Sequence, residues 1–238
     1  TGDRRSATTV IHEFGHYYDR WLYFDEDNVS NLDIAEVYSQ GLELLMHPYF
    51  DQIMENPEEA RKESLQDFLQ AITYQALYEE FQQRLYAMDS FTSQEVGQLY
   101  GELLNDYGFG DYTLPDEEGA DYSWYSMSHI FDAPFYTISY TTSAMVALQI
   151  WAESQQDWRA GADTYLKLIH EDQNQPFSSL ITGAGLKGMN DETIMHEIAG
   201  DFEEAFPASP SAGGLLPEDM FPEDTTPDES LPETAMAA

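Results

Sequence analysis

Hydrophobic positions recur with the spacing of α-helices along most of the chain. Near its start, four large apolar residues fall at i, i+4, i+7 and i+11 and so share one face of a helix. They are Val10, Phe14, Tyr17 and Trp21. The same period predicts helices over residues 33–46, 58–88, 134–153, 157–171 and 191–206. No convincing run alternates with a period of two, so the pattern predicts a mostly α fold.

Two segments break this helical pattern. Residues 105–125 contain three glycines and Pro115, so we expect a loop there, after a helix that begins at a capping box of Thr92 and Glu95. Residues 207–238 hold six of the eleven prolines, seven acids and no basic residue. Such a segment buries too little apolar area to offset the entropy of ordering. We therefore expect a folded core over residues 1–206, followed by an acidic, disordered tail.

Composition excludes several classes of protein. Aromatic residues make up 14% of the chain and hydrophobic residues 42%, which is too many for a solvated chain. Zero cysteines exclude a disulfide scaffold, a cysteine-ligated zinc site and thiol catalysis. A net charge of −36 repels phosphate backbones and anionic lipid. Nucleic acid and membrane surfaces are therefore poor partners for this chain.

The ends of the chain and its apolar runs bear on its location. No apolar run reaches the roughly 18 residues that a membrane span needs. The chain begins with Thr1 and shows no signal-peptide pattern, so we expect a cytoplasmic protein. A start without methionine also suggests a piece of a longer protein.

The first predicted helix carries a candidate metal site. Residues 12–16 read HEFGH, an HExxH element. Its two histidines, His12 and His16, are spaced i and i+4 and project from one helix face, as two ligands of one tetrahedral zinc must. Glu13 can then reach a metal-bound water and take its proton. HExxH also arises by chance in acid-rich sequences, so the pattern alone is only suggestive.

A third ligand is needed, and Glu36 is the candidate. It lies twenty residues after His16 on the next predicted helix, which an antiparallel return would bring back beside the first. Gln40 and Glu43 share its face, at i+4 and i+7. Two alternatives remain open from spacing alone. Asp33 and Glu36 could form a capping box, and Gln40 with Glu43 could be an ordinary solvated face.

Two further residues carry structural expectations. Gly15 costs its helix about 1 kcal/mol relative to alanine, which suits a place where a backbone or a substrate comes close. His47 follows the predicted end of the second helix, where an imidazolium can sit against the helix dipole. Neither His47 nor the later His170 and His196 has partners at ligand spacing, so we expect none of them to bind metal.

These motifs resemble those of the M3 family of zinc oligopeptidases, especially the oligoendopeptidase F branch. That family carries HExGH and then E-x-x-S-Q-x-x-E, and residues 36–43 of this chain read EVYSQGLE. The resemblance implies one zinc ion per chain, held by His12, His16 and Glu36. It also implies that Glu43 supports a zinc-bound histidine from behind.

A later segment adds to the resemblance. It matches the family's W…H…PFYxxxYxxS pattern with Trp124, His129, Phe131, Pro134, Phe135, Tyr136, Tyr140 and Thr141 to Ser143. In the family, a histidine and tyrosines of this segment donate hydrogen bonds to the oxygen of the tetrahedral intermediate. The resemblance thus implies catalytic roles for His129, Tyr136 and Tyr140. Aromatic residues at helical spacing are usually core, so that alternative stands beside it.

The resemblance covers residues 1–204, with departures. Asp19 stands where many members have a further histidine, and Tyr38 replaces a frequent proline. Members are usually more than twice as long, with an N-terminal helical half that forms the opposite wall of a deep channel. The chain is therefore expected to be the C-terminal catalytic portion of such a protein, with the catalytic core over residues 1–206.

The expected function is that of a zinc metalloendopeptidase cutting internal bonds of short peptides, with Glu13 as general base. The first alternative is an inactive or truncated homologue that binds zinc or peptide without turnover. The second is an acidic helical module in which HExxH is accidental. The acidity would favour cationic peptide substrates, or it would serve solubility in high salt.

Overall fold

The computed structural model describes residues 4–22, 32–171 and 174–206. Its α-helices are α1 (Arg4–Leu22), α2 (Leu32–Leu45), α3 (Phe50–Ile53), α4 (Pro57–Tyr86), α5 (Ser93–Asp106), α6 (His129–Asp132), α7 (Ile138–Gln156), α8 (Trp158–His170), α9 (Phe177–Ala184) and α10 (Thr193–Ala205). Single turns of 3-10 helix lie at His47–Tyr49, Gly110–Tyr112 and Ser123–Ser126. The described residues contain no β-strand, which confirms the predicted mostly α fold. The acidic segment 207–238 lies outside the described residues.

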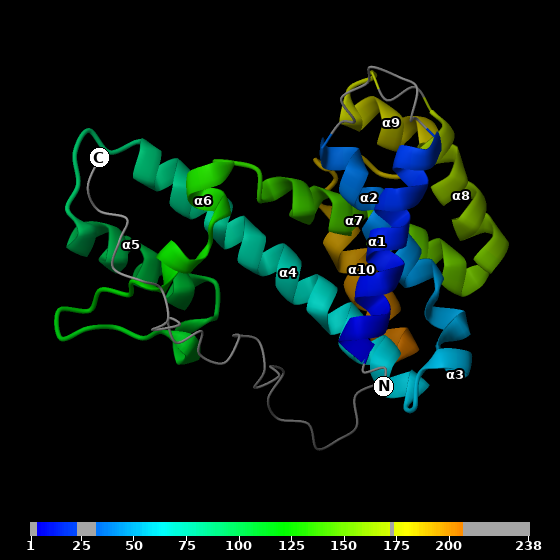
Figure 1. Cartoon of the computed structure of the whole chain (residues 1–238), viewed down its shortest axis with the longest axis horizontal. Helices are drawn as coiled ribbons and strands as arrows, with labels where there is room; N and C mark the ends of the chain where they lie inside the picture. Colours follow the sequence, from blue (N-terminus) through cyan, green and yellow to red (C-terminus); the bar gives the residue numbers. More distant parts are fainter. Residues whose placement is uncertain (1–3, 23–31, 172–173, 207–238) are drawn as a thin grey trace, which may run out of the picture.

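Figure 1 shows the long helix α4 running from a helix bundle at one end of the molecule to a smaller lobe at the other. The helix bundle consists of α1, α2, the first half of α4 and α7 to α10. Two hydrophobic clusters fill it, with α2 and α7 contributing to both. The lobe consists of the second half of α4, α5, α6 and the connections between them, around a third cluster. Helix α7 follows the lobe and leads the chain back into the bundle.

Local signals in the sequence explain several helix ends. The predicted capping box is present: the Glu95 backbone N–H donates to Thr92 Oγ1 at 3.2 Å, and the Thr92 N–H donates to Glu95 Oε2 at 2.8 Å. Asp157 caps α8 by accepting from the Arg159 N–H. Helix α9, which the periodicity does not predict, is only eight residues long and ends at Gly185 with a φ of 100°. A helix this short shows too little of its period to be recognised.

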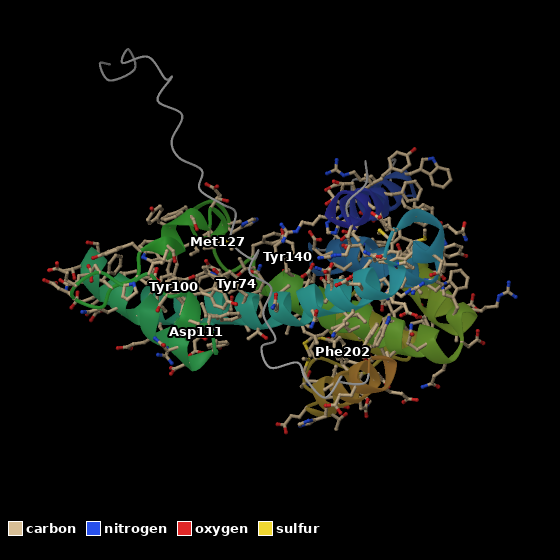
Figure 2. The ribbon with its side chains drawn as sticks, turned by 90° about the horizontal axis from the view of Figure 1, so that it is seen from below. Tyr74, Tyr100, Asp111, Met127, Tyr140 and Phe202 are labelled. Carbon is tan, nitrogen blue, oxygen red and sulfur yellow. The ribbon has the colours of Figure 1, made fainter. Side chains whose placement is uncertain are left out.

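Helix α1 presents its apolar stripe to solvent. The four stripe residues are 55–69% exposed: Val10, Phe14, Tyr17 and Trp21. The buried positions of α1 are Thr8, Gly15 and Asp19, on the opposite side of the helix. That side faces α2, while α1 lies along one edge of the bundle (Figure 2). Contact with α2, rather than the apolar stripe, therefore decides which face of α1 is buried.

Gly15 makes this contact close. A Cβ atom placed on Gly15 would lie 2.5 Å from the backbone oxygen of Tyr38 and 2.6 Å from Cα of Ser39. Real Cβ atoms do not approach backbone this closely, so only glycine permits the observed crossing. The expected close approach is confirmed, and it is made by the α2 backbone. It brings the HExxH segment against the helix that carries Glu36.

The Gly15→Ala variant is expected to unfold more easily, by about 1–3 kcal/mol, because the added methyl forces α1 away from α2. Urea unfolding of both proteins measures the difference. Gly200→Ala is the matched control: Gly200 is also helical, in α10, and a Cβ there would meet nothing within 4 Å. The control should gain up to about 1 kcal/mol. A Gly15→Ala variant as stable as wild type would contradict the close crossing.

His47 differs from expectation. Its side chain is buried, and its Nε2 atom lies 3.0 Å from Ser64 Oγ on α4. Burial, together with the positive charges of Arg61 and Arg4, lowers the pKa of His47 to about 3. The ring is therefore neutral at neutral pH, and the expectation of an imidazolium against the helix dipole is wrong. The helix end at which His47 lies is covered by α4 instead of facing solvent.

No helix among the described residues is both long enough and apolar enough to cross a lipid bilayer.

Candidate metal centre and active site

Helices α1 and α2 bring three side chains to one point. The Nε2 atoms of His12 and His16 are 3.2 Å apart. The Oε2 atom of Glu36 lies 3.6 Å from each of them. Within the part of the chain that the structure describes, this is the only group of three or more histidines or carboxylates arranged to share a metal ion. The spacing of the motifs and the resemblance both pointed to these residues.

The distances suit a tetrahedral zinc ion. Ligand atoms about 2.0–2.1 Å from such a centre lie roughly 3.4 Å from one another, and the three observed separations are 3.2, 3.6 and 3.6 Å. Two imidazoles and one carboxylate form a known catalytic zinc set that leaves a fourth position open. The donor atoms therefore fit zinc in both chemistry and spacing.

Glu43 fixes the orientation of His12. Its Oε1 atom lies 2.7 Å from His12 Nδ1, and its side chain is 14% exposed, which rules out an ordinary solvated position. A proton on Nδ1 leaves the Nε2 lone pair directed at the shared point. Burial acts to lower the pKa of His12, but the hydrogen bond and charge of Glu43, with the charges of Glu36 and Glu13, raise it overall. Gln40, on the turn before, has a buried amide oxygen with no hydrogen-bond partner among the described residues.

Glu36 is 6% exposed, and its carboxylate is held on both oxygens. The Ser39 hydroxyl lies 3.0 Å from Oε2, and the Tyr136 hydroxyl donates to Oε1 at 3.4 Å. Asp33 lies inside α2 and accepts a hydrogen bond from Ser139 on α7 at 2.5 Å. Because Asp33 does not precede the helix, the alternative capping box of Asp33 and Glu36 is not formed. Glu36 instead faces the two histidines.

Three aromatic side chains gather beside this point. His129 begins α6, Tyr136 lies in the turn before α7, and Tyr140 lies on the first turns of α7. The His129 and Tyr136 rings stack with centroids 5.7 Å apart, and Tyr140 meets Tyr136 edge to face at 5.1 Å. Figure 2 shows Tyr140 between the lobe and the bundle. The hydrogen bond of Tyr136 to Glu36 connects this group to the three potential metal ligands.

The two phenols are neutral hydrogen-bond donors at neutral pH. Burial raises the pKa of Tyr136, and its hydrogen bond with Tyr140 and the charge of Glu36 raise it further. Burial also raises the pKa of Tyr140, against the lowering effect of its hydrogen bond with Tyr136. Neither hydroxyl therefore ionises in the ordinary pH range of a hydrolase, and both retain a proton to donate.

One detail of the predicted site is wrong. The periodicity extends a helix back to Pro134, which would place Tyr136 and Tyr140 on consecutive turns. Helix α7 begins instead at Ile138, because Phe135 has a φ of 64° that no α-helix contains. The two tyrosine rings still meet, but the turn and not the helix positions Tyr136.

Three serines that support Glu36 and Asp33 had no predicted role. Ser39 belongs to the quoted E-x-x-S-Q pattern, yet its contact with Glu36 depends on a rotamer that no spacing reveals. Ser139 and Ser143 on α7 both donate to Asp33, to its side chain and to its backbone oxygen. The available signal was the spacing of these two serines, at i and i+4 near the start of α7. Glu13, by contrast, is found as expected on α1, exposed to solvent.

The Glu43→Gln variant is expected to bind zinc about 10–100-fold more weakly than wild type, because glutamine loses the charge that fixes and strengthens His12. Competition with a chelating dye measures the zinc dissociation constant. Glu102→Gln is the matched control, since Glu102 is exposed on α5 in the lobe. Equal affinity in Glu43→Gln and wild type would show that Glu43 plays no part in metal binding.

Comparisons with known proteins agree with the motifs. A family model described as peptidase family M3 matches residues 3–199. A protein described as an oligoendopeptidase F, solved at 3.1 Å, is 25% identical with a TM-score of 0.77, covering 86% of this chain and 37% of that one. PZ peptidase A, solved with an inhibitor, is 24% identical with a TM-score of 0.72, covering 83% and 36%.

A third structure, described as an oligoendopeptidase F from Bacillus anthracis strain Ames, is 18% identical with a TM-score of 0.68, covering 83% of this chain and 33% of that one. The similarity to PZ peptidase A and to this third structure concerns the fold alone. The chain spans a little over a third of the length of the first two solved structures and a third of the last. No curated protein sequence matches the chain.

Proposed function

This chain belongs to peptidase family M3, and from that premise we propose that it carries the active site of a zinc metalloendopeptidase that hydrolyses internal bonds of short peptides. The observation that carries the proposal is the convergence of His12, His16 and Glu36 at tetrahedral ligand spacing, with Glu43 behind His12. We take residues 1–206 as the catalytic core of this activity.

The proposed ligands and Glu13 divide the chemistry between them. Zinc bound by His12, His16 and Glu36 would polarise the scissile carbonyl and lower the pKa of a coordinated water. Glu13, one residue after His12, accepts a proton from the attacking water as its oxygen bonds to the carbonyl carbon. Glu13 then gives that proton to the amide nitrogen as the C–N bond breaks. Its exposure on α1 leaves the carboxylate within reach of solvent and substrate.

His129, Tyr136 and Tyr140 stabilise the carbonyl oxygen as it gains negative charge. Two observations support this role: the Tyr136 hydroxyl lies 3.4 Å from Glu36 Oε1, and the three rings pack on one another. Neutral donors that are already oriented cost no reorganisation when the charge develops. The hydrogen bond of Tyr136 connects this group directly to one of the proposed ligands, Glu36.

The substrate proposed is a short peptide, and a cationic one is favoured by charge. The chain carries 45 acids against nine Lys and Arg, and Glu13, Glu36 and Glu43 add negative charge at the site itself. Such a field raises the local concentration of cationic ligands, and salt screens it. Cleavage of a lysine-rich peptide should therefore fall with rising salt more steeply than cleavage of a neutral one.

Peptide cleavage tests the proposed function directly. The purified chain, loaded with zinc, is incubated with quenched fluorescent peptides of about six to twelve residues, and the products are identified by mass spectrometry. We expect internal cleavage that a chelator abolishes and added zinc restores. A protein that binds one zinc ion yet cleaves none of these peptides would instead be an inactive or truncated homologue.

The Tyr136→Phe and Tyr140→Phe variants separate catalysis from packing. If a hydroxyl donates to the oxyanion, its removal should lower kcat by about 10²–10³-fold with little change in KM or melting temperature. His129→Ala should also act mainly on kcat. Steady-state kinetics and thermal melting of each variant provide the measurements.

Tyr100→Phe is the control for this series. The Tyr100 hydroxyl is buried in the lobe with the hydroxyls of Tyr74 and Tyr78, 3.2 Å and 3.1 Å away, and lies apart from Tyr140 in Figure 2. Its loss should cost about 1 kcal/mol of stability and leave kcat unchanged. If the variants at Tyr136 and Tyr140 behave like this control, the two tyrosines are core residues.

A further inference from the structure

The residue before Tyr136 has an unusual backbone. Phe135 is the only non-glycine residue with positive φ in the described part of the chain, at 64°. A bulky aromatic residue rarely adopts this left-handed conformation without outside support. The Phe135 ring packs against Tyr86 with centroids 5.1 Å apart, but it remains 40% exposed, so ring burial is a weak source of that support.

A fully buried amide on α4 contacts the backbone at this position. The Gln82 side chain accepts a hydrogen bond from the Phe135 N–H at 2.8 Å through Oε1. Its Nε2 donates to Thr137 Oγ1 at 3.4 Å and to the Tyr78 backbone oxygen at 3.2 Å. One side chain thus contacts the residues on both sides of Tyr136. Because a buried amide must be satisfied, these bonds fix its orientation.

We propose that Gln82 is a positioning residue for catalysis: it holds Phe135 and Thr137 so that the intervening Tyr136 points its hydroxyl at the metal centre. The inference rests on the function proposed above and deepens it. Gln82 lies in the lobe part of α4, whereas the three metal ligands lie in the helix bundle. The lobe would thereby contribute to the active site without any contact with substrate or metal.

The geometry leaves little tolerance at Tyr136. Its hydroxyl is 3.4 Å from Glu36 Oε1, near the outer limit of a hydrogen bond, so a small rotation of the turn would break the contact. The packing of Tyr136 on His129 and Tyr140 is the competing explanation for its position. If that packing suffices, the loss of Gln82 should leave Tyr136 where it is.

Gln82→Met tests the proposal, because methionine fills a similar volume and has no amide. Tyr136 is replaced by 3-fluorotyrosine, whose ¹⁹F resonance reports its surroundings with or without turnover. We expect the Gln82→Met resonance to shift or broaden, the Phe135 amide to exchange its hydrogen faster, and kcat to fall by up to about 10²-fold at nearly constant KM. Gln83→Met, at the exposed neighbouring position, should match wild type.

Rescue distinguishes positioning from general stability. Glycine adopts positive φ without strain, so adding Phe135→Gly to Gln82→Met should restore much of kcat and the wild-type ¹⁹F resonance. Thermal melting is recorded for every variant. Gln82→Asn, which keeps the amide but shortens its reach, takes the place of Gln82→Met if the latter fails to fold.

The proposal is overturned if Gln82→Met leaves the Tyr136 resonance and kcat as in wild type, even if the protein melts at a lower temperature. It is also overturned if kcat falls and Phe135→Gly restores neither kcat nor the resonance. A wild-type chain that cleaves no peptide would contradict the proposed function. In that case the ¹⁹F spectra and hydrogen exchange still decide whether Gln82 positions Tyr136.

Discussion

Replacing Glu13 by glutamine is expected to remove most peptide cleavage while the protein stays folded and keeps its zinc. Glu13 supplies none of the three converging donor atoms, and its side chain is exposed on α1. Glutamine has nearly the same shape but cannot accept a proton from water. General-base catalysis contributes about 10²–10⁴-fold, so kcat should fall by that amount.

The measurement combines kcat on a quenched fluorescent peptide with zinc content by mass spectrometry and helicity by circular dichroism. Glu59→Gln is the control, because Glu59 is an exposed carboxylate in the first turn of α4. It should cleave at the wild-type rate. If Glu13→Gln also cleaves at that rate, the proposed mechanism is wrong whatever the zinc content.

The second large effect is expected at the metal ligands. His16→Ala removes one of the three donors. Its zinc affinity should fall further than that of Glu43→Gln, for which we expect a loss of about 10–100-fold. Glu36→Gln is the sharper variant, since glutamine preserves the size of the side chain but is a poor zinc ligand. Both should lose zinc during dialysis under conditions in which wild type retains close to one ion per chain.

His196→Ala is the matched control for these variants, because His196 is exposed on α10 and far in sequence from the site. It should retain zinc like wild type. Equal zinc in His16→Ala, Glu36→Gln and wild type would remove the proposed metal site. If only His16→Ala loses zinc, His16 is a ligand and Glu36 has a purely structural role.

The elements of the fold could be predicted because helical periodicity and local caps are properties of neighbouring residues. The run that predicts a helix over 33–46 yields α2 at Leu32–Leu45, and the Thr92–Glu95 capping box starts α5. The convergence of His12 and His16 follows from helix geometry alone. Glu36 required more, since its approach depends on how two helices pack, and the family pattern supplied that information.

What the sequence did not reveal depends on contacts between distant residues. Periodicity shows that four apolar residues of α1 share a face, but not that the opposite face, with Gly15, is the one against α2. The burial of His47 depends on Ser64 and α4. The turn at Phe135 depends on Gln82, 53 residues earlier. Gln82 stands between Phe81 and Gln83 on α4, and this local sequence gives no sign of its distant partner.

Zinc K-edge X-ray absorption on the zinc-loaded chain tests the central claim most directly, because it reports the ligands of the ion itself. We predict two imidazole nitrogens with oxygen ligands completing the shell, at about 2.0–2.1 Å. His16→Ala, reconstituted with excess zinc, should show a single imidazole. A wild-type spectrum with one imidazole or with three, or a spectrum that His16→Ala leaves unchanged, would contradict a zinc site built from His12, His16 and Glu36.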